Sequence, residues 1–257
     1  MIKQSSGSRE NHRLIFLVPL ISSRLASDWG EVVDHLSLTI NSILRSTSEH
    51  FLIGICHNQE DKIPDFRDSR VVAIPANFPP NGDVGAGTID KRRKVRAAAA
   101  YFKSEQMGDN YFMFLDADDL VHRELVAYVL GKAEDKAYLI NEGYCYDSLN
   151  GSFSAISGEF HLLCGSCFIS YFNTSELPDD YMDDECLLSK IQGGRHRNWG
   201  GRAKRFGKKV SRIPFPAIVY HMNHSESLRG MKTGFVPRIV GKKLGFLESR
   251  LVRQVFL

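Results

Sequence analysis

The chain has 257 residues, of which 43% are hydrophobic and 25% charged, so it has enough apolar material for one large globular domain or one domain with a small appendage. The first thirteen residues are mostly polar and the apolar run at 14–21 is only strand-sized, so we expect neither a signal peptide nor a membrane-spanning helix. The five cysteines are odd in number and lie in apolar surroundings, which predicts a reduced protein in the cytoplasm.

Charge is distributed unevenly along the chain, although the net charge is only +3. After residue 190 there are 15 of the 33 Lys and Arg residues but only 2 of the 30 Asp and Glu residues. This asymmetry predicts an anionic partner for the C-terminal part, such as a phosphate, a nucleic acid or a membrane surface.

The chain opens with alternating strands and helices. Apolar runs predict strands at 14–21, 51–56 and 71–74, and a stripe of apolar residues at helical spacing predicts a helix over 29–44. This order predicts an α/β fold with a mostly parallel sheet, whose ligand sites lie at the carboxyl ends of the strands. Asn58, Asp61 and Asp116 would then share one edge.

A segment rich in Pro, Gly and Asn at 75–89 predicts a mobile loop, and it lacks the spacing of a P-loop or a dinucleotide fingerprint. Asp90 is the predicted N-cap of a helix that runs to about residue 106. Lys91 and Lys94 share one face of this helix and are placed to reach a diphosphate, whereas its other cations are expected on a solvated face.

The apolar run at 111–115 predicts a central strand, and three carboxylates follow it: Asp116, Asp118 and Asp119. Alternation along a strand would direct Asp116 and Asp118 to one side, while Asp119 would point away or open the next turn. Two carboxylates side by side repel each other unless a cation lies between them, and Mg²⁺ or Mn²⁺ prefers such oxygen ligands. The alternative is a solvated turn that caps a helix over 122–132.

The middle of the chain predicts a strand at 137–142 and a mostly apolar segment at 159–172. Cys164-Gly165-Ser166-Cys167 interrupts that segment. Since no second Cys-x-x-Cys pair occurs, we interpret it as a close approach of the backbone to a ligand, permitted by glycine, in preference to a metal or redox site.

Asp183, Asp184 and Glu185 lie in a second acidic cluster, before a predicted helix at 186–191. The helix dipole favours acids at this position, and one of them could instead be a general base.

The segment 193–212 has eight Lys or Arg residues and no acid, and this segment alone resembles a nucleic-acid patch. A strand at 218–221 ends in His221. Beyond residue 233, an amphipathic basic helix is predicted to lie on an anionic membrane or to dock on the domain.

In this order, the motifs resemble the nucleotide-sugar-dependent glycosyltransferases of the GT-A fold, most closely the family 2 type, over about residues 14–225. Asp116-Ala117-Asp118 matches the DxD motif, and Gly165 matches the glycine loop. The segment 183–187 resembles the Glu-Asp-x-x-Leu segment that contains the catalytic base. His221 matches the late histidine. The chain departs from the family at His57-Asn58, where an acidic residue contacts uracil.

The resemblance implies a Rossmann-like, mostly parallel sheet flanked by helices, with a glycosyltransferase domain at 1–230 and a basic amphipathic segment at 231–257. It implies Mn²⁺ or Mg²⁺ bound by Asp118, Asp116 and His221. It also implies that Asp184 is the catalytic base, with Asp183 and Glu185 as alternatives if the register differs by one residue. The implied nucleotide-sugar contacts are Pro19, Asn58, Asp61, Asp90, Lys91, Lys94, Asp116, Ala117, Asp118 and Gly165.

The implied activity is inverting transfer of a single sugar, from a UDP-sugar donor to a hydroxyl of a glycan or lipid-linked acceptor, at the inner face of a membrane or in the cytoplasm. The Gln-x-x-Arg-Trp segment of processive synthases is not present. The alternatives are a retaining GT-A transferase and a sugar nucleotidyltransferase. A nucleic-acid or anionic-surface binding protein on an inactive scaffold is the non-enzyme alternative, but it leaves the acidic clusters unexplained.

Overall fold

The computed structural model describes residues 12–80, 87–132, 135–226 and 242–257. The strands are β1 (Leu14–Pro19), β2 (Phe51–Asn58), β3 (Val71–Ala76), β4 (Asn110–Phe114), β5 (Leu120–Val121), β6 (Ala137–Leu139), β7 (Gly143–Asp147), β8 (Ser152–Ile156), β9 (Phe168–Phe172), β10 (Val210–Arg212), β11 (Ile218–Met222) and β12 (Lys242–Lys243). The helices are α1 (Trp29–Leu44), α2 (Gly87–Ser104), α3 (Leu125–Leu130), α4 (Leu187–Gln192), α5 (Trp199–Arg205) and α6 (Phe246–Phe256), with 3₁₀ turns η2 (Phe160–Leu162), η3 (Thr174–Glu176) and η4 (His196–Asn198).

The larger sheet has seven strands in the order β10-β6-β9-β4-β1-β2-β3. β1 pairs in parallel with both β2 and β4, β2 pairs in parallel with β3, and β10 pairs in parallel with β6. Only β9 is antiparallel, to β4 on one side and to β6 on the other. The predicted α/β architecture with a mostly parallel central sheet flanked by helices is therefore confirmed.

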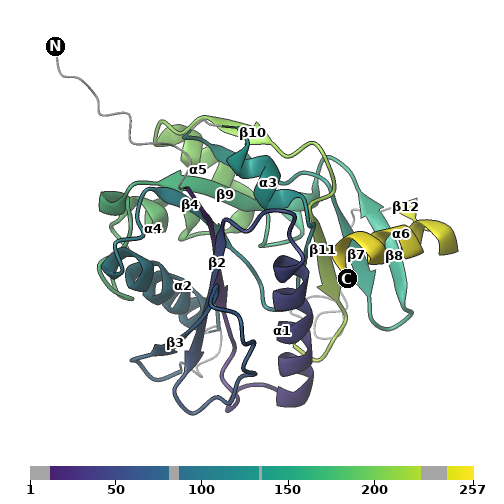
Figure 1. Ribbon diagram of the computed structural model, residues 1–257, viewed down its shortest axis with the longest axis horizontal. Coiled ribbons are helices and arrows are strands. Elements are labelled where there is room, and N and C mark those ends of the chain that lie inside the picture. The colour runs from purple at the N-terminus through teal and green to yellow at the C-terminus, as the bar shows by residue number, and fades with distance from the viewer. Residues whose placement is uncertain (1–11, 81–86, 133–134, 227–241) are drawn as a thin grey trace.

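Helices α1 and α2 lie on opposite sides of the β1-β2-β3 part of the sheet (Figure 1). This arrangement follows from right-handed crossovers, because the connection through α1 runs from β1 to β2 and the connection through α2 runs in the opposite direction along the sheet, from β3 to β4. In α1, Asp28 is the N-cap, and its side chain accepts a hydrogen bond from the Glu31 amide. The buried face of α1 contains Val32, Leu36, Ile40 and Ile43. Because both faces are covered, every residue of β1 and β4 is buried.

A second sheet, which the sequence analysis did not predict, has the order β12-β8-β7-β11-β5. In Figure 1, α6 (yellow) lies beside β7 and β8 of this sheet. Val252 and Phe256 of α6 are buried against Phe153 of β8 and Val219 of β11. The described part of the C-terminal segment thus packs on the domain.

Several predicted boundaries were wrong. Asp90 is not an N-cap, because α2 already begins at Gly87. The helix predicted at 122–132 is only α3, because residues 120–121 are still extended as β5 and pair with β11. The strand predicted at 137–142 ends at Leu139, where the chain leaves for the second sheet. Residues 81–86 of the predicted loop and residues 227–241 lie outside the described residues.

Among the residues described, no helix combines the length and apolar character needed to cross a bilayer.

Candidate active site

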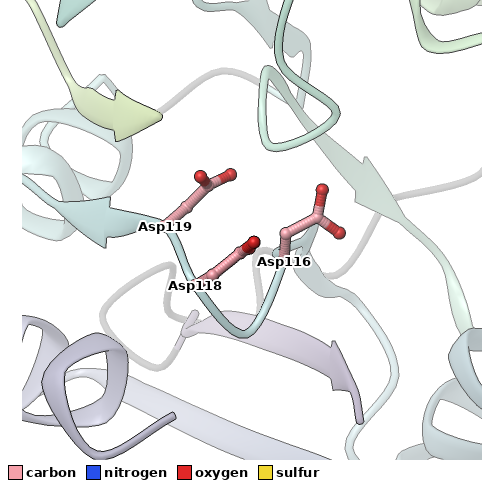
Figure 2. Close-up of side chains that lie close together, drawn as sticks. All are labelled: Asp116, Asp118 and Asp119. Atoms are coloured by element: carbon pink, nitrogen blue, oxygen red, sulfur yellow. The ribbon is translucent and has the colours of Figure 1, made fainter. Parts of the chain in front are cut away.

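Three aspartates gather in the turn between β4 and β5. One ligand oxygen from each of Asp116, Asp118 and Asp119 lies within 4.8 Å of the other two. Figure 2 shows the three side chains on the same side of the turn. The prediction that Asp119 would face away from the other two was wrong, because strand alternation ends at Phe114. The Asp119 amide donates to the Asp116 carbonyl at 3.2 Å, and this bend returns the third carboxylate to the first two.

The charges of this cluster are incompletely balanced by protein groups. Burial, followed by the charges of Asp118 and Asp116, raises the pKa of Asp119 well above its ordinary value. Burial also opposes ionisation of Asp118, but contact with His224 and the charge of Lys91 lower its pKa overall. A buried carboxylate whose charge its neighbours disfavour is a suitable ligand for a hard divalent cation. The donor set therefore fits Mg²⁺ or Mn²⁺.

Neighbouring elements hold the turn in place. Thr39 of α1 donates its hydroxyl to the Ala117 carbonyl at 2.9 Å, which fixes Ala117 through its backbone. The Asp116 amide donates to the Ser166 hydroxyl at 2.9 Å, and the Cys164 thiol lies 3.1 Å from an Asp119 oxygen. The segment 164–167 thus contacts the aspartate cluster directly, through the Ser166 hydroxyl and the Cys164 thiol.

Gly165 lies against Asp116. A Cβ atom at position 165 would be 3.1 Å from Asp116 Oδ2 and 3.4 Å from the Phe114 ring. Because these distances are tighter than ordinary van der Waals contact, the segment approaches the carboxylate cluster most easily with glycine here. This geometry agrees with the interpretation of the segment as a close backbone approach.

The structure brings His224 to the carboxylates and leaves the His221 side chain outside the group of converging ligand oxygens. His224 Nε2 lies 2.8 Å from Asp118 Oδ2, and His224 is 4% exposed. His221 instead donates its backbone N–H to Asp119 at 3.3 Å, and its ring Nε2 contacts the Ser148 hydroxyl. Burial, with the nearby His35 and His224, lowers the pKa of His221 to about 4, so this ring is neutral near pH 7. The sequence analysis missed His224, although it lies three residues from His221.

Three of the predicted nucleotide-sugar contacts, Pro19, Asn58 and Asp61, lie at the carboxyl ends of β1 and β2. Pro19 is the buried last residue of β1. The Asp61 carboxylate accepts from the Asn58 amide at 2.9 Å and from the Ser23 amide at 2.8 Å. Asp61 therefore joins the loops after β1 and β2. Asn58 and Asp61 at the end of β2, and the aspartates after β4, lie at the carboxyl ends of two parallel strands on either side of β1, at one edge of the sheet, as predicted.

Lys94 and Asp90 form a buried pair in α2, 2.9 Å apart. The Lys94 ammonium also donates to the Leu20 carbonyl at 2.7 Å and to Asn58 Oδ1 at 2.6 Å. Because an ammonium has three N–H groups, Lys94 has none left for a diphosphate in this arrangement. Its position indicates that it fastens α2 to the ends of β1 and β2.

Lys91 has a different environment on the same helix. It pairs with Asp116 and lies 5.0 Å from the centre of the Phe114 ring. Lys91, Asp116 and Gly165 all line a cavity of about 480 Å³, and Asp184 lines it as well. Residues from α2, from the turn after β4, from the glycine segment and from the second acidic cluster therefore meet at one cavity.

The three acids of the second cluster have different surroundings. Asp183 accepts backbone N–H groups from Asp179, Glu185 and Cys186, each at 3.1 Å. Although burial opposes it, these bonds lower the pKa of Asp183. Glu185 is 3.0 Å from Lys190 and does not line the cavity. Asp184 is the acid of the three that faces the cavity, which favours it as the candidate base.

Comparisons with known proteins give only distant similarities. No protein-family model matches the chain, and no curated protein matches it by sequence. Among solved structures it resembles 4-diphosphocytidyl-2C-methyl-D-erythritol synthase from Anaerococcus prevotii, with 10% identity, a TM-score of 0.39, and coverage of 84% of this chain and 89% of that chain. It also resembles a protein described as a nucleotide-diphospho-sugar transferase from Desulfovibrio desulfuricans G20, with 14% identity, a TM-score of 0.34, and coverage of 81% and 79%. Rv0371c from Mycobacterium tuberculosis H37Rv has 10% identity, a TM-score of 0.34, and coverage of 95% and 99%.

Proposed function

We propose that the protein is a metal-dependent glycosyltransferase that moves a single sugar from a nucleotide donor to a hydroxyl group with inversion. The observation that carries this proposal is the arrangement of two different carboxylate environments around one cavity. Asp116 belongs both to the buried cluster and to the cavity, and Asp184 lines the same cavity from another element. One environment is suited to a cation and the other to a proton.

The aspartate cluster is the proposed donor site. Asp116, Asp118 and Asp119 would hold Mn²⁺ or Mg²⁺, and His224 would orient Asp118 through their contact. The cation, when bound, neutralises charge on a diphosphate leaving group. Lys91 lies beside the cluster and supplies a further positive charge toward the same group. Asn58, Asp61, Asp90 and Lys94 support the donor pocket by fixing the ends of β1 and β2.

Asp184 is the proposed catalytic base. It would take the proton from an acceptor hydroxyl as that oxygen forms its bond to the anomeric carbon. The bond between that carbon and the diphosphate breaks on the opposite face, and the nucleoside diphosphate leaves with the electron pair. Attack from the opposite face inverts the configuration. UDP is our proposed nucleotide, although the position of the family's uracil-contacting acid is occupied here by His57 and Asn58.

A sugar nucleotidyltransferase is the second candidate, because a carboxylate cluster with a divalent cation also suits attack on a nucleoside triphosphate. Such an enzyme releases pyrophosphate and uses a phosphate oxygen as nucleophile, which needs no base. Asp184 in the cavity favours the glycosyltransferase. Product stereochemistry, measured by NMR, separates the inverting enzyme from a retaining one.

A peripheral membrane contact through α6 belongs to this proposal. Phe246, Leu247 and Leu251 are 83%, 72% and 62% exposed, and Lys242 and Arg250 are exposed near them. Apolar side chains with flanking cations suit the interface of an anionic bilayer. Such a contact would hold the protein at the surface where a lipid-linked acceptor lies. Vesicle sedimentation with and without phosphatidylserine tests it, and equal sedimentation of wild type and a Leu247→Glu, Leu251→Glu variant would contradict it.

The decisive experiment is hydrolysis of a panel of nucleotide sugars without acceptor, first with Mn²⁺ and then with EDTA. We expect slow release of a nucleoside diphosphate from one donor, and loss of that release in EDTA. Release of pyrophosphate from a nucleoside triphosphate and a sugar phosphate would favour the nucleotidyltransferase. Absence of turnover, together with absence of nucleotide binding by calorimetry, would contradict both.

A further inference from the structure

The cavity beside the aspartate cluster is lined by more positive than negative side chains. Arg92 and Arg96 reach it from α2, and Arg195 reaches it from the segment before η4. None of these three arginines forms an ion pair with any residue that the structure describes. The like charges of Arg202 and Arg96, together with burial as the largest cause, lower the pKa of Arg92. Arg92 and Arg195 are exposed and Arg96 is half-buried. Guanidinium groups without ion-pair partners on the wall of one cavity make that wall favourable for an anion such as phosphate.

A fourth guanidinium group, that of Arg202, lies near Arg92. Arg202 of α5 is half-buried and lies so close to Gly194 that a Cβ atom at position 194 would clash with it. Gly194 itself lines the cavity. The glycine therefore permits Arg202 to approach the cavity wall, and a side chain at this position would push the guanidinium away.

Polar atoms at the cavity wall lack protein partners. Gln192 of α4 is 6% exposed, and both its amide nitrogen and its amide oxygen are buried without a hydrogen-bond partner among the residues described. Arg96 Nε is also buried without such a partner, and Arg96 donates a long hydrogen bond from Nη1 to the Met182 carbonyl at 3.5 Å. Both residues line the cavity. A buried amide without a partner costs about 1–3 kcal/mol, so a polar ligand that pairs with it would be favoured.

Arg96 lies near the segment that contains Asp184, because its Nη1 is 3.5 Å from the Met182 carbonyl. Asp118 and Asp119 do not line the cavity, and Asp116 is the carboxylate that the two sites share. A donor diphosphate beside Asp118 and Asp119 would therefore leave the part of the cavity around Arg96 for a second ligand.

We propose that this cavity is the acceptor site and that the acceptor carries a phosphate group, bound by Arg92, Arg96 and Arg195. This inference deepens the proposed glycosyltransferase function and rests on it. The phosphate would be anchored by the guanidinium groups, Gln192 would hydrogen-bond the acceptor's hydroxyls, and the reacting hydroxyl would face Asp184. The soluble form of this chemistry is a sugar phosphate, and the lipid-borne form is a lipid phosphate.

Calorimetry in EDTA tests the proposal with four probes: inorganic phosphate, glucose 6-phosphate, short-chain phosphatidic acid and uncharged glucose. We expect a phosphate-bearing probe to bind more tightly than glucose, and the better of glucose 6-phosphate and phosphatidic acid identifies the source. Arg96→Gln and Arg195→Gln should each weaken that binding about tenfold, because each removes a charge-assisted hydrogen bond. Arg197→Gln is the matched control, since Arg197 is exposed in η4 and does not line the cavity.

Equal phosphate binding by Arg96→Gln, Arg195→Gln and wild type would overturn the proposal. Displacement of glucose 6-phosphate by UDP with Mn²⁺ would also overturn it, because the arginines would then belong to the donor site. Joint binding of the two ligands supports it. If phosphate binding depends on the arginines but no nucleotide sugar is hydrolysed, the anion site stands and the proposed glycosyltransferase function fails.

Discussion

The two acidic clusters of this chain have similar sequences and different surroundings. At 116–119 the acids are buried or half-buried, and their oxygens converge within 4.8 Å. At 183–185 they are more exposed, Asp183 is occupied by three backbone N–H groups and Glu185 pairs with Lys190. Carboxylate oxygens that converge without enough positive partners suit a cation site. The carboxylates of Asp183 and Glu185 already have local hydrogen-bond or ion-pair partners of their own. Asp184 is the exception in the second cluster, because it lines the cavity.

The largest effect is expected from Asp184→Asn. If Asp184 is the base, transfer should fall by about a thousandfold, because general bases typically contribute 10²- to 10⁴-fold. The melting temperature and donor binding should stay near wild type, since the side chain is exposed. Steady-state transfer rates and calorimetry with UDP measure the two effects. Full activity in this variant would remove Asp184 from the role of base.

The stability of the protein should depend on metal through the aspartates at 116–119 and not through the acids at 183–185. Mn²⁺ at one hundred times its dissociation constant should stabilise the protein by about 2.7 kcal/mol. For a chain of this size, the melting temperature should rise by roughly 5–10 °C. Asp119→Asn should lose most of this rise, and Asp184→Asn should retain it. An equal rise in both variants would place the metal elsewhere.

His224 and His221 contact the aspartate cluster in different ways, His224 through its ring and His221 through its backbone N–H. His224→Gln should weaken Mn²⁺ binding by about tenfold or more, because His224 contacts Asp118 directly and such supporting groups typically contribute 10- to 100-fold. His221→Gln should have a smaller effect, because His221 reaches Asp119 through its backbone. A larger loss in the His221 variant would restore the side chain of His221 as a ligand.

The smallest effect is expected from Asp183, which accepts three backbone N–H groups in the turn before α4. Asp183→Ala should destabilise the protein by about 1 kcal/mol, because these hydrogen bonds are lost, and lower the melting temperature by roughly 2–4 °C. Because the pKa of Asp183 is lowered in the folded state, its contribution is present above the ordinary aspartate pKa of about 3.9 and is lost as pH falls through the lowered value. The difference between wild type and variant should therefore shrink below about pH 4. A difference in the free energy of unfolding that stays constant down to pH 2 would contradict a stabilising role for the ionised Asp183 carboxylate.

Local patterns predicted much of this structure. The apolar runs predicted the parallel strands, because buried strands need continuous apolar residues. The acids after β4 predicted carboxylates at the carboxyl end of that strand, and Gly165 predicted a close backbone approach, which the structure shows toward Asp116. These features depend on short sequence spacing, so one sequence is enough to see them.

The features that the sequence analysis missed depend on contacts between distant segments. The turn that returns Asp119 to Asp116 cannot be distinguished from an extended strand by alternation. The contact between His224 and Asp118 depends on how the chain turns after β11 ends at Met222. The spacing of Lys91 and Lys94 places both on one helix face. Lys94 is nevertheless buried, because Leu20 and Asn58 at the ends of β1 and β2 accept hydrogen bonds from it. The arginine-lined cavity joins α2 with the segment before η4, about one hundred residues later.

The central claim, a metal-dependent donor site at the first acidic cluster, is tested most directly by titrating Mn²⁺ and following the free ion by electron paramagnetic resonance, with and without UDP. We expect wild type and Asp184→Asn to bind one Mn²⁺ that UDP makes tighter, and Asp118→Asn to lose this binding. Mn²⁺ binding that is unchanged in Asp118→Asn, or that does not respond to UDP, would contradict the assignment.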